Sequence, residues 1–130
     1  MRRIMPFAAV ALWAFAACGC SDGPTLYRVV GEVSWKGVPI EDGQINFISE
    51  DGSLPPATAK IVNGRYEAWV AAGRMKVEIH GQRDMGFDKT MNQRTKVHYV
   101  DREYNFETIL RFDVQKNDDN RADFHLFPKK

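Results

Sequence analysis

Two cysteines, Cys18 and Cys20, are the most reactive side chains of this 130-residue chain, and they stand one residue apart at the end of an apolar run. No other cysteine occurs in the sequence. A disulfide between residues this close would be strained and would close almost no loop, so it would not stabilise a fold. The pair therefore needs another explanation, and the residues that precede it indicate modification of a thiol.

The segment Phe15-Ala16-Ala17-Cys18 resembles the bacterial lipobox, in which one large apolar residue and two small ones precede a cysteine. That cysteine is lipidated on sulfur and becomes the new N-terminus. We therefore expect lipidation of Cys18. Gly19 before Cys20 offers a second register, so Cys20 is the alternative. Two or three acyl chains on one residue exceed what stable membrane anchoring requires. Ala14-Phe15-Ala16 also fits an ordinary signal peptidase site, so plain secretion is the competing hypothesis.

Serine and histidine are the other side chains that could support catalysis. The histidines His80, His98 and His125 lie in separate segments, and no serine stands in a glycine-rich elbow. No histidines or acids have the spacing of a zinc site. Asn117–Asn120 offers oxygen ligands but lacks the glycine and spacing of a calcium loop, and its residues also favour a hairpin turn. We therefore expect no enzyme activity, no metal site and no cofactor.

The N-terminal residues predict export. Arg2 and Arg3 precede an apolar run over residues 4–17, which is shorter than the roughly 20 residues that span a bilayer. We expect a lipoprotein signal peptide over residues 1–17, the lipidated cysteine and a short tether over residues 18–27, and one domain over residues 28–130. The predicted location is the cell envelope, anchored in the outer membrane or facing the periplasm. A formal net charge of +1 gives no electrostatic reason to expect a nucleic acid partner.

The residues after the tether alternate between apolar and polar in short segments separated by turn-forming residues. This pattern is typical of antiparallel strands with one buried face. Asn63-Gly64 between two such segments predicts a type I′ hairpin turn, because both residues tolerate a positive φ. Expected strands include 29–35, 45–49, 57–62, 65–70, 75–79, 108–114 and 122–126. These elements predict an all-β fold, an antiparallel β-sandwich of about seven strands.

Several of these segments resemble the carboxypeptidase regulatory-like, or transthyretin-like, sandwich domain found in small lipoproteins of planctomycete-type bacteria. The resemblance rests on residues 36–40 (KGVPI), 63–66 (NGRY), 72–77 (AGRMKV), 104–105 (YN) and 120–126 (NRADFHL). Asp101 departs from the usual proline before the Tyr-Asn pair, and Met75 replaces the usual tyrosine after Gly73. The resemblance implies a transthyretin-like or immunoglobulin-like sandwich without a catalytic motif, serving as an extracytoplasmic scaffold or recognition module.

Two places in the predicted domain could bind a partner. Trp69 shares a face with Arg65 and Glu67, where its ring could stack on a sugar, anchor a protein partner or cover the sandwich edge. The segment over residues 81–96 is expected to be a long polar loop, either a binding surface or a flexible connection. It carries Met85 and Phe87 among basic residues such as Arg94.

The function predicted from these features is that of a lipid-anchored envelope protein. Its sandwich would give structural support or recognise an envelope protein or a polysaccharide near the membrane, through a candidate surface of Trp69, Met85, Phe87 and Arg94. The alternatives are a soluble secreted carbohydrate-binding module and a hydrolase that these motifs do not reveal.

Overall fold

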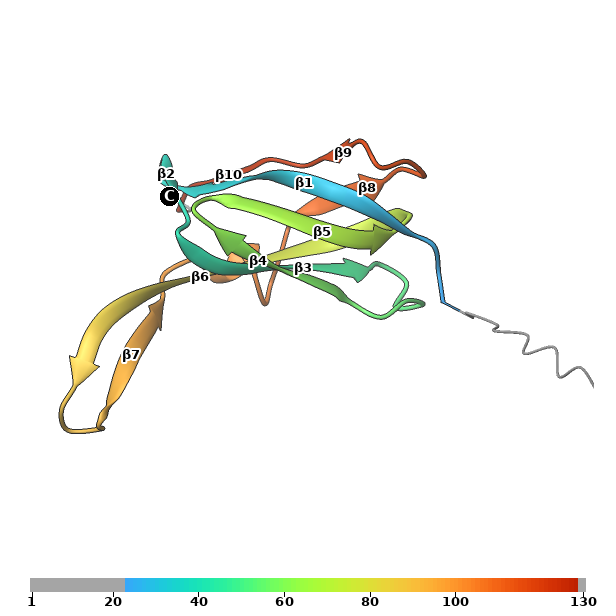
Figure 1. The fold of residues 1–130 in the computed structure, drawn as a ribbon. Coiled ribbons are helices and arrows are strands. Elements are labelled where there is room, and N and C mark those ends of the chain that lie inside the picture. Colours follow the sequence, from blue (N-terminus) through green and yellow to red (C-terminus); the bar gives the residue numbers. More distant parts are fainter. Residues whose placement is uncertain (1–22, 129–130) are drawn as a thin grey trace, which may run out of the picture.

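Ten β-strands and one short 3₁₀ helix form the computed structural model, which describes residues 23–128 (Figure 1). In chain order the elements are β1 (Leu26–Trp35), β2 (Val38–Pro39), β3 (Asp42–Ser49), β4 (Ala57–Val62), β5 (Arg65–Ala71), β6 (Gly73–Asp88), β7 (Gln93–His98), η1 (Arg102–Tyr104), β8 (Arg111–Val114), β9 (Asn120–Arg121) and β10 (Phe124–Leu126). No α-helix occurs within residues 23–128. The expected lipidation sites, Cys18 and Cys20, lie outside the described residues.

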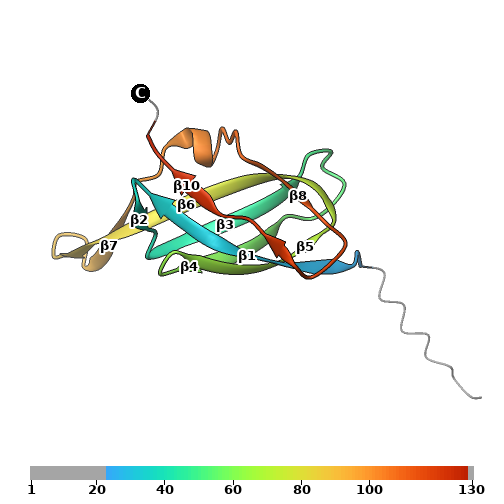
Figure 2. The ribbon, with the colours of Figure 1, turned by 90° about the horizontal axis from the view of Figure 1, so that it is seen from above.

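The strands form one curled sheet whose two halves face each other. The strand order is β10-β1-β5-β4-β3-β6-β7, with β2 and β9 also paired to β1, and β8 also paired to β6. β4 and β5 pair only at their turn, through Val62 and Arg65. Beyond the turn β5 follows β1 whereas β4 follows β3, so the hairpin opens into two layers (Figures 1 and 2). The predicted all-β sandwich architecture is confirmed.

The exception to antiparallel pairing is the C-terminal segment, since β9 and β10 run parallel to β1. β8 pairs with β6 and so lies in the layer opposite β1. The chain then crosses to the edge of β1 and runs along it in the same direction as β1. Between β9 and β10 the backbone passes very close to Gly31, where an added Cβ would lie 1.8 Å from the carbonyl oxygen of Ala122. Only glycine fits at that position, because any side chain there would overlap the neighbouring backbone.

The core lies between the two layers and follows the alternation that the sequence predicts. The buried apolar residues are Val29, Val33, Trp35, Ile40, Ile45, Phe47, Ile61, Tyr66, Ala68, Val70, Ala71, Met75, Val77, Ile79, Val100, Val114, Ala122, Phe124 and Leu126. The predicted turn also forms, with φ of 50° at Asn63 and 77° at Gly64. Local pattern and turn chemistry therefore fix the registers that bury one face of each long strand.

The segment over residues 99–110 protects the edge of β6. β8 pairs with residues 73–76 of this strand and β7 with residues 82–88, which leaves residues 77–81 between them. There the Val77 amide donates to the Leu110 carbonyl at 3.1 Å, and the Tyr99 amide donates to the Gly81 carbonyl at 3.2 Å. Covering a free strand edge in this way removes a surface on which other chains could pair.

The two ends of the sandwich differ. β1 begins at one end, where Leu26 pairs with Ala71, and finishes at the other, where Trp35 pairs with Val38. We call the first the entry end. The second is called the hairpin end, because there β6 and β7 leave the body together and project from it (Figure 1). This polarity sets the positions of all the candidate sites below.

Candidate functional site

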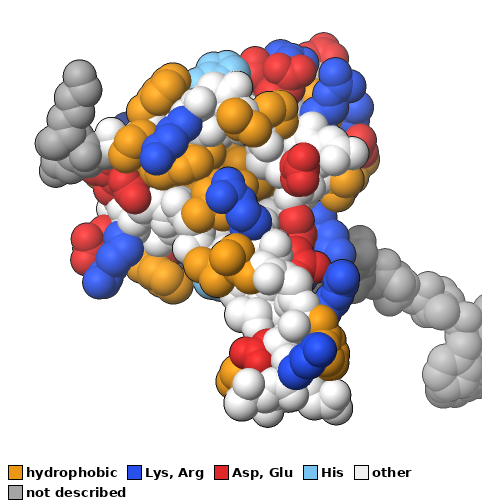
Figure 3. Space-filling model, turned by 90° about the vertical axis from the view of Figure 1, so that its left-hand side faces the viewer, with side chains coloured by type: hydrophobic (Ala, Val, Ile, Leu, Met, Phe, Trp, Pro, Cys, Tyr) orange, Lys and Arg blue, Asp and Glu red, His pale blue; other side chains and the backbone are white. Residues whose placement is uncertain are grey.

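A cleft of about 700 Å³ lies at the hairpin end, between the end of β1, the loop after β2 and the base of the β6–β7 hairpin. Its volume falls within the range of about 300–1,000 Å³ that ligand sites occupy. Figure 3 looks onto this end and shows hydrophobic side chains gathered around lysine and arginine side chains above the projecting hairpin. The cleft therefore combines apolar and charged surface.

Aromatic rings and cations meet in this cleft. The Lys36 ammonium lies 5.8 Å from the centre of the Trp35 ring, and the Arg83 guanidinium lies 5.0 Å from the centre of the Tyr99 ring. Both distances are within the reach of a cation–π contact. Partial burial raises the pKa of the Tyr99 hydroxyl, an effect that Arg83 opposes. Glu41 also lines the cleft, so anionic, cationic and aromatic groups are all available to a ligand.

One ion pair joins the β6–β7 hairpin to β3, and a second joins the two strands of the hairpin. The Lys96 ammonium on β7 contacts the Asp42 carboxylate on β3 at 2.8 Å, and this hydrogen bond raises the pKa of Lys96. Farther out, the Arg94 guanidinium contacts the Asp84 carboxylate at 3.1 Å. Arg94, expected as part of a binding surface, is thus held by an acid of its own hairpin.

The expectation of a long polar loop over residues 81–96 is wrong, because this segment forms most of the β6–β7 hairpin. The ladder is interrupted between Asp84 and Phe87, where Gly86 adopts a φ of 96°. Neither face of the hairpin is buried in the body, so no regular alternation marks its strands in the sequence. Met85 and Phe87 are 64% and 56% exposed, and both project from the hairpin toward solvent together with Met91 at the turn.

Trp69 lies away from this cleft, near the entry end, on the outer face of β5. Its side chain is 50% exposed, which confirms the predicted side of the strand. The residue directly opposite on β1 is Arg28, whose guanidinium contacts the Glu67 carboxylate at 3.5 Å. The structure therefore separates Trp69 from the residues Met85, Phe87 and Arg94 with which the sequence grouped it.

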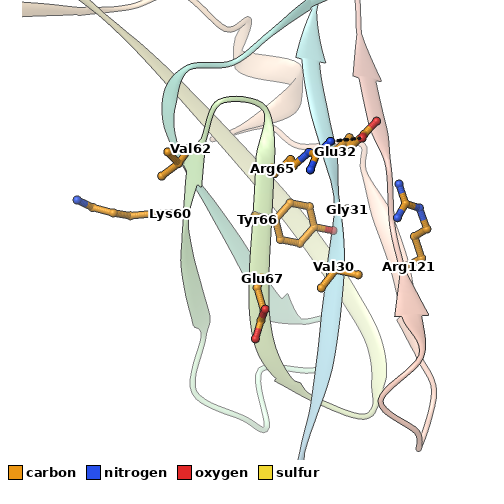
Figure 4. A pocket seen from close by; sticks show the side chains of 9 residues that line it. All are labelled: Val30, Gly31, Glu32, Lys60, Val62, Arg65, Tyr66, Glu67 and Arg121. Atoms are coloured by element: carbon orange, nitrogen blue, oxygen red, sulfur yellow. Dashed lines mark ion pairs between the residues drawn. The ribbon is translucent and has the colours of Figure 1, made fainter.

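A shallower hollow of about 540 Å³ lies on the outer side of β1, β4 and β5, and Figure 4 shows the side chains that line it. The Arg65 guanidinium contacts the Glu32 carboxylate at 3.8 Å across this hollow. Tyr66 points inward instead, and its hydroxyl donates to the Ala122 carbonyl at 2.7 Å. Charged side chains of both signs line the hollow, and beneath it Tyr66 ties β5 to the C-terminal segment across Gly31 of β1.

The histidines do not converge on one site. His80 and His98 lie edge to face, with ring centres 6.4 Å apart, and His80 is also 5.4 Å from the exposed ring of Phe106. His125 instead shares a hydrogen bond of 2.9 Å with Ser34 on β1. This serine–histidine contact was not predicted, because the two residues are 91 positions apart in the sequence.

The Ser34–His125 pair lacks the third group of a catalytic triad within residues 23–128. The nearest acid in the sequence, Asp123, accepts a hydrogen bond from the Glu32 amide at 2.8 Å and contacts Arg121 at 3.1 Å. The Glu32 amide in particular lowers the pKa of the Asp123 carboxylate. Asp123 thus holds the C-terminal segment on β1, and among residues 23–128 no acid is hydrogen-bonded to the His125 ring.

The oxygens of Asn117–Asn120 accept backbone hydrogen bonds that shape a turn. Asn117 Oδ1 accepts from the Asp119 amide at 2.9 Å, and Asp118 Oδ1 accepts from the Arg28 amide at 3.1 Å. Asn120 is buried and bonds both the amide and the carbonyl of Gln115. Among residues 23–128, no three histidine, cysteine, aspartate or glutamate side chains cluster as metal ligands. No helix in this part of the chain is long and apolar enough to cross a membrane.

The residues of the cleft carry no sequence signal that could have found them. Trp35, Arg83 and Tyr99 come together only through contacts between distant segments. Trp35 and Arg83 are ordinary strand residues, and Tyr99 directly follows β7. The turn at Lys36-Gly37 is recognisable, since both residues have positive φ, but a turn does not predict a cleft.

No protein-family model matches the chain, and no curated protein matches it. Among solved structures, a 9R-lipoxygenase from Cyanothece PCC8801 is similar to it at a TM-score of 0.38 and 17% identity. The alignment covers 80% of this chain and 16% of the lipoxygenase chain. A likeness this low carries no argument about function.

Proposed function

We propose that the chain is a lipid-anchored, extracytoplasmic protein whose β-sandwich is a non-catalytic recognition module of the carboxypeptidase regulatory-like type. The anchor is a lipid on Cys18, or alternatively on Cys20, and the location is the cell envelope. The sequence before Cys18 supports the anchor, and the all-β sandwich is consistent with the proposed family.

The observation that carries this proposal is that the tether and the candidate binding surfaces lie at opposite ends of the sandwich. The tether joins β1 at the entry end, whereas the cleft and the hairpin lie at the other end (Figure 1). Ten strand residues span about 30 Å, and the projecting part of β6 from Gln82 to Asp88 adds about 20 Å. A lipid at the N-terminus would therefore present the hairpin away from the membrane that holds the chain.

The hairpin is suited to bind a protein. Met85, Phe87 and Met91 are all more than half exposed, and their apolar surface has no covering element within residues 23–128. Methionine adapts its shape to a partner, and an exposed aromatic ring between methionines can anchor the contact. The ion pair between Arg94 and Asp84 stiffens the hairpin that presents them. We propose that the partner is an envelope protein.

A photo-cross-linking amino acid placed at Phe87 in the intact bacterium tests this function. The matched control is the same substitution at Phe106, which is 75% exposed but lies outside the hairpin. Position 87 should cross-link one discrete envelope protein, and the additional change Met85→Ser should abolish the product. Equal labelling from positions 87 and 106, or no product from position 87, would contradict the hairpin as the recognition element.

A secreted carbohydrate-binding module is the second candidate, and a group of polar side chains on the outer face of β3 favours it. Asn46 Oδ1 accepts hydrogen bonds from Gln44 at 2.9 Å and from Thr58 at 3.0 Å, and Asn46 Nδ2 contacts Glu78 at 3.4 Å. Ordered amides and hydroxyls are groups that can bind a sugar. Binding to insoluble polysaccharide that Asn46→Ala abolishes would favour this candidate.

A further inference from the structure

Three outward-facing side chains form a small patch at the entry end, which we call the entry patch: Leu26, Arg28 and Trp69. Arg28 and Trp69 are directly opposite on β1 and β5, and Leu26 is the diagonal neighbour of Trp69. Leu26 is 49% exposed, Trp69 is 50% exposed, and the Arg28 side chain is 43% exposed. The patch thus combines one aliphatic, one cationic and one large aromatic group.

The position of the entry patch distinguishes it from other exposed apolar residues. Arg28 is the third residue of β1, so Trp69 lies beside the point at which the tether enters the fold. The neighbouring Val70 is 1% exposed, which shows that this strand buries its other face fully while leaving the indole outside. Tryptophan has an apolar ring with a polar N–H, the combination that is enriched at membrane–water interfaces.

We propose that the entry patch rests on the bilayer to which the chain is tethered, with the Trp69 indole in the headgroup region. Leu26 adds apolar area beside it, and the Arg28 guanidinium lies at the level of the lipid phosphates. This inference rests on the lipid anchor of the proposed function. In this arrangement Trp69 contacts lipid, whereas the β6–β7 hairpin at the opposite end contacts the protein partner.

The length of the chain before β1 argues for this occupant. Leu26 is eight positions after Cys18 and six after Cys20. At about 3.3–3.6 Å per extended residue, the tether keeps Leu26 within about 29 Å of a lipidated Cys18. A surface held this close to the bilayer has a high effective concentration there. The tethered patch therefore contacts the bilayer even if the same contact is too weak to bring an untethered domain to the membrane.

Charge does not drive the contact. The Arg28 guanidinium already contacts Glu67 at 3.5 Å, and the Arg28 amide donates to the Asp118 carboxylate nearby. An entry end with acids beside its cation has no preference for anionic lipid. The contact therefore rests on burial of the indole and of Leu26, and it persists at high salt and on zwitterionic lipid.

Tryptophan fluorescence in vesicles tests the inference. The mature protein is purified from a bacterial host with lipoprotein maturation and reconstituted in phosphatidylcholine vesicles whose acyl chains carry bromine, a quencher. Trp35 is only 8% exposed and lies at the hairpin end, so it serves as an internal reference. Quenching should remove about half of the emission, because one of the two domain tryptophans lies in the interface, and Trp69→Phe should abolish the quenching.

The matched control moves the reporter to the other end of the molecule. Phe87→Trp in the Trp69→Phe background places an indole on the hairpin, at a site that is also about half exposed. It should remain unquenched. Equal quenching at both positions, or unquenched Trp69 in a chain whose mass includes the lipid, overturns the bilayer contact but leaves the anchor intact. A mass without lipid overturns the anchor, and the bilayer contact with it.

Discussion

Replacing Tyr66 by phenylalanine removes one buried hydrogen bond and keeps the ring. The Tyr66 hydroxyl donates to the Ala122 carbonyl at 2.7 Å, and the residue is only 4% exposed. The change leaves that carbonyl without its hydroxyl donor, a loss of about 2 kcal/mol in the free energy of unfolding. For a domain of this size the melting temperature should fall by roughly 8 °C.

The same variant should respond differently to alkali. Burial raises the pKa of the Tyr66 hydroxyl above its ordinary value of about 10, and Asp123 adds to this effect. The folded state therefore keeps the proton when the unfolded state loses it. The contribution of Tyr66 is complete below about pH 10 and falls by about 1.4 kcal/mol per pH unit above it. The stability difference between wild type and Tyr66→Phe should consequently narrow between pH 8 and pH 11.

Urea unfolding followed by tryptophan fluorescence at both pH values measures these effects. Tyr27→Phe, at a half-buried tyrosine outside this contact, is the control and should change stability little. A Tyr66→Phe midpoint equal to that of the wild type at pH 8, or a difference that widens at pH 11, would refute the assigned hydrogen bond.

Three further predictions follow from the described contacts. Gly31→Ala should prevent folding, because its Cβ would overlap the Ala122 carbonyl, whereas Gly23→Ala meets open space and should melt as the wild type does. Asn105→Ala should cost about 2 kcal/mol in denaturant unfolding, because this buried amide bonds two carbonyls of the segment that covers β6. The hydrogen-bonded Asp123 carboxylate has a lowered pKa and stabilises the fold above its unfolded pKa. Asp123→Asn should therefore destabilise at pH 7, and the difference from wild type should disappear as acid protonates Asp123.

Much of the fold could be predicted because its signals are local. Val29 and Val33 alternate with polar residues because one face of β1 is buried, and Asn63-Gly64 forms its turn because both residues accept positive φ. Residues 81–96 gave no such signal, since a hairpin without a buried face needs no alternation. The parallel pairing of β10 with β1 also lacks a local signal, because it depends on the route of the chain between layers.

The candidate site was less predictable than the fold. The sequence identified two exposed groups, Trp69 because it shares a strand face with Arg65 and Glu67, and Phe87 because it stands in a polar segment. It could not place them at opposite ends, because their separation depends on strand order and register. The cleft beside Arg83 and Tyr99 likewise arises only from contacts between distant segments.

The most direct test of the anchored module is the intact mass of the mature protein from a bacterial host with lipoprotein maturation. Wild type is compared with Cys18→Ser and Cys20→Ser. The anchor predicts a diacylglyceryl mass increment that disappears only in Cys18→Ser, or only in Cys20→Ser if the second register is used. Cleavage after Ala14 or Ala16 without any lipid would contradict the anchor and leave a secreted protein.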